Sequence, residues 1–167
     1  GINLAAAEIG ELQLEGGGEI SGLNSPASRE VSFSIDARAS GIEPQDPGVA
    51  RAVGDTISFS TNGRWATGQN LQIADARVTA ETLDIVAQGV LDGLTFNGTA
   101  EVEAANLQAF SLVADRDLAG RASLAVDGEV AAVGGSFDLL FDGSLTDARF
   151  GTDSVDRLLA GETRLTG

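Results

Sequence analysis

The chain has 167 residues, 43% of them hydrophobic, and a formal net charge of −15. Phosphate backbones bind through neutralising cations, so this acidic, lysine-free chain is excluded as a nucleic-acid-binding protein. The absence of cysteine excludes disulfides and thiolate metal sites.

Most side chains that carry enzyme chemistry are missing. There is no His, Cys, Lys or Tyr, so the usual general bases and nucleophiles are absent. Carboxylate pairs of the glycosidase type remain, but the aromatic platforms typical of sugar sites do not, because only one Trp is present. The Asp-Gly pairs lack the spacing of EF-hand loops and calcium β-rolls. We therefore predict no enzymatic activity, no metal and no cofactor.

Alternating apolar and polar residues predict strands along most of the chain. Near the N-terminus, residues 12–15 and 19–23 predict two short strands separated by three glycines at 16–18. Residues 31–39 give the clearest strand, because five apolar residues alternate there with Ser, Asp and Arg. The stretch 41–54 contains two of the three prolines and is predicted to be the longest irregular loop.

The alternation continues through the centre and the C-terminal part, interrupted by Asn-Gly and Asp-Gly pairs. Such pairs favour the positive φ of tight hairpin turns, so turns are predicted at them. The pairs lie at 62–63, 92–93, 97–98, 127–128 and 142–143. One short helical turn is expected after Asn106 as its cap, and another over 153–160 with Asp153 as N-cap and Leu158 and Leu159 facing inward.

The pattern predicts an all-β fold, an elongated, antiparallel, curved sheet with one or two short helical turns. Residues 159–166 restate residues 118–125 about forty positions later, which indicates a repeat-like array. We expect a single β segment over 1–167, excised from a longer chain, with weak sub-units near 1–54, 55–105 and 106–167. A β-solenoid or a sandwich is the alternative fold.

The large apolar residues of the predicted strands are the candidate binding residues. In an open, curved sheet they would line a groove whose natural guest is a lipid acyl chain. In a closed fold they would form the core, and alternation alone does not separate the two arrangements. Trp65 fits either a core or rim position or a contact with a partner. The groove candidates are Val31, Phe33, Ile35, Ile57, Phe59, Leu71, Ile73, Leu83, Ile85, Phe96, Val102, Leu124, Val126, Phe137, Leu139 and Phe141.

The C-terminal half of the chain resembles a known family. The residues that carry the resemblance are the runs NLQAFS at 106–111, DLAGRASL at 117–124, FDL at 137–139 and VDRLLAGETRL at 155–165. Over about residues 83–167 they are similar to the TamB family, the inner-membrane subunits of the translocation and assembly module, within the AsmA-like group of bridge-like lipid-transfer proteins. The Ala-rich, acidic, lysine-free style is similar to that of alphaproteobacterial members.

The resemblance implies a periplasmic half-pipe, or β-taco, with an apolar inner wall. Such proteins carry phospholipid between the inner and outer membranes of Gram-negative bacteria or support outer-membrane protein assembly, and they have no catalytic residues. The implied partners are phospholipid acyl chains and, for the full-length protein, an outer-membrane barrel of the Omp85 type. The inner-membrane anchor is expected to lie outside this segment.

Two other functions stay open. A structural or adhesive β-solenoid of a secreted or surface protein would use the same apolar residues as a sealed core. An assembly chaperone would instead offer a free sheet edge to client strands, and backbone pairing would then carry the recognition. Lipid binding distinguishes a β-solenoid with a sealed core from an open lipid-binding groove, because a sealed core holds no lipid.

Overall fold

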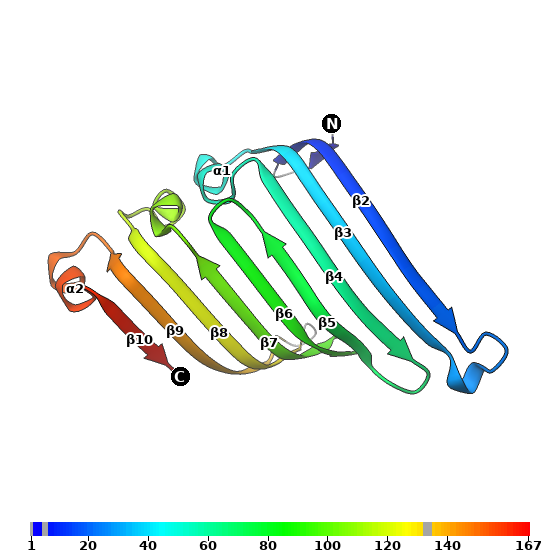
Figure 1. Ribbon diagram of the computed structural model, residues 1–167. Coiled ribbons are helices and arrows are strands. Elements are labelled where there is room, and N and C mark those ends of the chain that lie inside the picture. The colour runs from blue at the N-terminus through cyan, green and yellow to red at the C-terminus, as the bar shows by residue number, and fades with distance from the viewer. Residues whose placement is uncertain (1, 5–6, 132–134) are drawn as a thin grey trace.

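The protein folds as one open, curved sheet. The computed structural model describes residues 2–4, 7–131 and 135–167, and within them ten strands form a single antiparallel sheet in chain order. Figure 1 shows the strands side by side in one layer, curving along their length, with the two ends of the chain at opposite edges. The predicted all-β, curved, open sheet is confirmed. These strands form neither a sandwich nor a closed solenoid.

Most strands are long, and the helical segments are short. The strands are β1 (Ile2–Leu4), β2 (Ala7–Ser21), β3 (Glu30–Pro44), β4 (Thr56–Ala66), β5 (Leu71–Thr79), β6 (Leu83–Asp92), β7 (Thr95–Ala104), β8 (Ala119–Ala131), β9 (Phe137–Arg149) and β10 (Glu162–Thr166). The helices are α1 (Pro47–Val53) and α2 (Asp153–Leu158), and the single 3-10 turns are η1 (Pro26–Ser28) and η2 (Leu107–Phe110).

Four of the five predicted Asn-Gly and Asp-Gly turns are wrong. Only the pair at 92–93 lies in a turn, between β6 and β7. The pairs at 62–63, 97–98, 127–128 and 142–143 lie inside β4, β7, β8 and β9. The glycines at 16–18 likewise do not divide two strands, because β2 runs through them. Strand pairing supplies the physical reason at several of these positions.

Several of these glycines face one another across the sheet in one row. The register links Gly18, Phe33 and Gly63, and it continues through Ile73 to Gly89, Gly98 and Gly128. A Cβ at Gly98 would overlap the carbonyl oxygen of Gln88, and one at Gly128 would overlap that of Asp138. Glycine therefore allows neighbouring backbones to approach here.

Among the described helical segments, α1, η2 and α2 lie at one end of the sheet, the upper end in Figure 1, and η1 lies at the opposite end, between β2 and β3. The predicted loop over 41–54 is wrong, since β3 extends to Pro44 and α1 follows. Asp46 caps α1, with its Oδ1 accepting from the backbone N–H groups of Gly48 at 2.7 Å and Val49 at 3.2 Å. The helix α1 contacts η2, and Thr82 Oγ1 ties the β5–β6 turn to α1 by donating to the Ala52 carbonyl at 2.6 Å.

The two predicted helical turns are present, with one correct cap. Asn106 Oδ1 accepts from the N–H of Gln108 at 3.0 Å, as expected for the cap of η2. The N-cap of α2 is Thr152 rather than Asp153, and its side chain makes no capping hydrogen bond. Leu158 was expected to face inward but is 80% exposed. The helix α2 is too short to bury both leucines.

The molecule has very little sealed core. Among the described residues the buried hydrophobic side chains are Ala52, Ala109 and Ala148, which lie in α1, in η2 and near the end of β9. The accessible surface is 10843 Å². A compact protein of 17.0 kDa would expose about 7,700 Å². The difference reflects a single layer whose two faces are both largely accessible.

Candidate functional site

Strand register assembles one apolar face across the sheet. Side chains of residues paired across antiparallel strands point to the same face of the sheet. Along each strand, successive side chains point alternately to the two faces. Val31 pairs with Ile20 and Trp65, and Ile85 pairs with Val78 and Val102. Followed from Leu12–Ile20 of β2 to β10, these pairs join apolar residues, glycines and two threonines. We call this surface the apolar face. The same phase reaches a charged pair, Glu8 with Glu43, at the end of β2 and β3 next to α1.

The register places all the predicted groove candidates on the apolar face. In β3 to β5 these are Val31, Phe33, Ile35, Ile57, Phe59, Leu71 and Ile73. In β6 to β9 they are Leu83, Ile85, Phe96, Val102, Leu124, Val126, Phe137, Leu139 and Phe141. They form one continuous surface rather than separate clusters. Their role as a lipid-binding wall stays a prediction.

The apolar face has further members that were not among the predicted groove candidates. The register adds residues of β2, β5, β6, β8 and β9, namely Leu12, Leu14, Ile20, Val78, Leu91, Val130 and Leu145. The signal for those in β2 was the alternation itself, which continues in phase across the three glycines. Trp65 also belongs to this face, opposite Val31. It lies at the end of β4, next to the loops that join β2 to β3 and β4 to β5.

Side chains on the apolar face are half-exposed rather than buried. Leu124, near the centre of β8, is 39% exposed. Most residues of the apolar face in β4 to β7 are likewise only partly covered. Exposure rises at the outer strands, to 69% for Leu14 and 74% for Phe137. Contiguous hydrophobic side chains that stay half-exposed are typical of interaction surfaces.

Aromatic rings cover two positions of the glycine row. Phe33 Cζ would lie 2.8 Å from a Cβ on Gly63, and Phe96 Cζ would lie 2.8 Å from a Cβ on Gly89. Both rings therefore occupy the space that a neighbouring side chain would need, as in cross-strand aromatic–glycine pairs of other sheets. The middle of the apolar face is accordingly lined by ring and backbone atoms.

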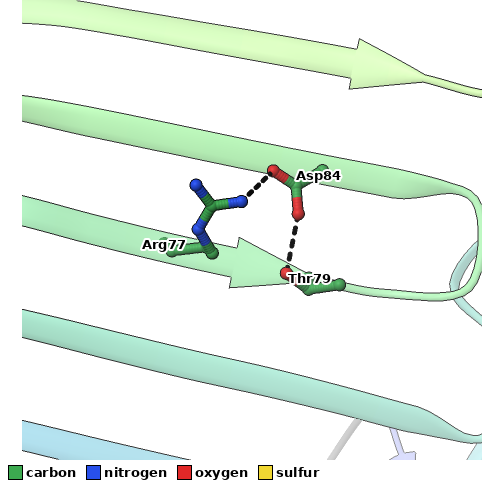
Figure 2. A network of polar contacts seen from close by, with 3 residues as sticks. All are labelled: Arg77, Thr79 and Asp84. Carbon is green, nitrogen blue, oxygen red and sulfur yellow. Dashed lines mark hydrogen bonds and ion pairs between the residues drawn. The ribbon is translucent and has the colours of Figure 1, made fainter.

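The opposite face of the sheet is polar. Arg77 Nη1 donates to Asp84 Oδ1 at 2.9 Å, and Thr79 Oγ1 donates to Asp84 Oδ2 at 2.7 Å (Figure 2). Further along the same face, the hydroxyls of Ser123 and Ser144 are 2.8 Å apart across β8 and β9. The sheet thus has one face with charged side chains and one face that is apolar from Leu12 of β2 to β10.

Open hollows also lie on the polar face. Three open hollows of about 330, 530 and 400 Å³ are lined mostly by its side chains, among them Arg38, Arg64 and Glu101. Within the described residues no group of three or more acidic side chains is placed to hold a metal ion. What the arrangement offers is a place for an apolar molecule to leave water, through the apolar face.

The comparisons with known proteins add no relative. No family model, no curated protein and no solved structure matches this chain. In the part of the chain that the structure describes, no helix has the length and apolar character needed to cross a bilayer.

Proposed function

We propose that this chain is a segment of a periplasmic lipid conduit of the TamB type, in which the apolar face shields phospholipid acyl chains in transit between the two membranes. The observation that supports the proposal is the uncharged apolar face, which runs from β2 to β10 with its large side chains half-exposed. Uncharged surface suits hydrocarbon, which offers no group to hydrogen-bond.

The face is wide enough for a whole acyl chain. Strands about 4.8 Å apart span roughly 38 Å from β2 to β10 along the sheet. One leaflet of a bilayer has a hydrocarbon depth of about 15 Å, so a full-length acyl chain lying across the strands covers about three to four of them. The side chains replace water around the hydrocarbon, and no residue has a catalytic role.

The same proposal extends to location and partners. An inner-membrane-anchored protein of the periplasm, working with an outer-membrane barrel of the Omp85 type, would place such a conduit between the two membranes. Support for outer-membrane protein assembly is the second role that the resemblance implies.

One observation favours a second candidate function. The strand β2 has 15 residues, and β1 pairs only with its first three, Ala7–Ile9. Among the described strands none pairs with the outer edge of β2 beyond this point. A long, unbulged edge of this kind is a site for strand addition, as an assembly chaperone would use it. Such pairing would not depend on the apolar face.

Adjacent residues of β4 provide a matched test. Phe59 lies on the apolar face and Ser58 on the polar face. We expect Phe59→Asp to weaken binding of a fluorescent phospholipid at least about tenfold, because a carboxylate would be buried under hydrocarbon. Ser58→Asp adds the same charge and should leave binding unchanged. Far-ultraviolet circular dichroism checks that both variants keep the sheet.

The opposite pattern would count against the conduit. If Phe59→Asp and Ser58→Asp bound the phospholipid equally well, the apolar face would not be the lipid site. If the unaltered chain bound no lipid, a structural or adhesive module or a strand-pairing chaperone would replace it.

A further inference from the structure

One end of the apolar face carries an arginine. From Leu12 of β2 to β10, the cross-strand pairs place no charged residue on the face itself, and the pair Glu8–Glu43, in the same phase, lies at the other end of β2 and β3. Arg29 comes directly before β3, two positions from Val31, and its backbone is extended, with φ −72° and ψ 133°. Alternation from Val31 therefore puts the Arg29 side chain at the end of the apolar face.

The pairing next to Arg29 supports this placement. The Arg29 carbonyl accepts hydrogen bonds from the N–H of Thr67 at 2.9 Å and from its Oγ1 at 3.3 Å. Val31 pairs with Trp65, so Arg29 opposite Thr67 continues the antiparallel register by one further step. Arg29 and Trp65 are thus diagonal neighbours at the same end of β3 and β4.

The guanidinium of Arg29 contains a hydrogen-bond donor without a partner among the described residues, the Nε atom. Its Nε is buried and, in the part of the chain that the structure describes, has no hydrogen-bond partner. Buried donors without a partner are uncommon, and one of the explanations for such a group is an ion bound from outside the chain. Guanidinium groups suit phosphate oxygens in both charge and geometry.

Trp65 has the properties of a residue at a boundary between hydrocarbon and water. It is the single Trp of the chain and is 38% exposed. An indole ring packs against apolar atoms while its N–H meets polar groups, which is why Trp concentrates at the headgroup level of membranes. An arginine beside it, at the end of an uncharged face, matches a molecule with an anionic head and an apolar tail.

We propose that Arg29 and Trp65 form a headgroup site, in which Arg29 binds the phosphate of a glycerophospholipid whose acyl chains lie on the apolar face beyond Val31. The inference rests on the proposed lipid-binding function and adds the direction in which the lipid lies on the apolar face. The opposite end of β4 follows Asp55, an exposed carboxylate, and the chain as a whole repels anions with its net charge of −15. The phosphate therefore lies at the Arg29 end.

The single Trp makes the site directly measurable. Quenching of Trp65 fluorescence is followed with two lipids that share the same brominated acyl chains, phosphatidylglycerol and diacylglycerol, which lacks the phosphate. The test variant is Arg29→Gln. The control is Arg64→Gln, which removes the same charge next to Trp65 from a side chain on the polar face, hydrogen-bonded to Gln72 at 2.7 Å.

We expect Arg29→Gln to raise the Kd for phosphatidylglycerol about tenfold and to leave that for diacylglycerol within about twofold. Arg64→Gln should change neither. Equal weakening for both lipids, or no weakening for either, would overturn the headgroup site while leaving lipid binding on the apolar face intact. If neither lipid quenched Trp65 in the unaltered chain, the proposed function would fail, and the headgroup site with it.

Discussion

Individual glycines show how closely neighbouring strands approach. At Gly98 a Cβ would overlap the Gln88 carbonyl and would lie 2.7 Å from Gly89 Cα, which is backbone and cannot move aside. At Gly16, on the same face of β2, a Cβ would meet the Ser34 carbonyl oxygen at 3.6 Å, an ordinary contact. Two glycines of one face therefore differ in whether they tolerate a side chain.

This difference gives a prediction at the residue scale. Gly98→Ala should lower the free energy of unfolding by about 1–3 kcal/mol, because overpacking shifts two strands. Gly16→Ala should change it by less than about 1 kcal/mol, and in the stabilising direction, because it restricts the unfolded chain. Urea unfolding followed by circular dichroism measures both. Equal destabilisation would mean that the glycine row does not control strand approach.

The glycines also mark the limit of what the sequence reveals about single residues. An Asn-Gly or Asp-Gly pair signals a residue that needs either positive φ or freedom from a Cβ. At Gly93, with φ 60°, the first need applies and the predicted turn is correct. At Gly98 the residue must lack a Cβ, because the neighbouring strand lies too close. A single sequence does not separate these needs, because close approach arises from a strand that is not adjacent in the sequence.

At the scale of the elements, local signals located the strands better than the helices. Period-two alternation identified β3 and the phase of every strand that carries a groove candidate. The helix α1 was missed because Pro44 and Pro47 suggested a loop, although Asp46 followed by Pro47 is a typical N-cap and first helical residue. The second helix was predicted with the wrong cap, because Thr152 and Asp153 both have capping side chains.

The two caps provide a matched pair for the second prediction. Asp46→Ala should weaken α1 by about 1 kcal/mol, because the capping carboxylate accepts two backbone hydrogen bonds there. Thr152→Ala should have little effect on α2, whose cap makes no side-chain hydrogen bond. Hydrogen exchange, resolved by residue, would show faster exchange in α1 alone. Unchanged protection in α1 would mean that the contact with η2, not the cap, stabilises this helix.

At the scale of the whole molecule, the sheet leaves an apolar surface without a cover. Alternation alone did not separate a sealed core from an open face, because both hide one side of each strand from water. A sealed core needs two layers, whereas the described strands form a single layer. The buried hydrophobic side chains of the described residues are three alanines at the end of the sheet where α1 and η2 lie. The conduit proposal therefore depends on which molecule covers the apolar face.

The most direct test is to purify the chain from cells without detergent and to weigh it by native mass spectrometry, before and after extraction with organic solvent. We predict bound phospholipid in stoichiometric amounts, which extraction releases and which Phe59→Asp lacks. A folded chain free of lipid, or one that keeps the same lipid in Phe59→Asp, would contradict the conduit. A lipid-free dimer would show that a second copy covers the apolar face instead.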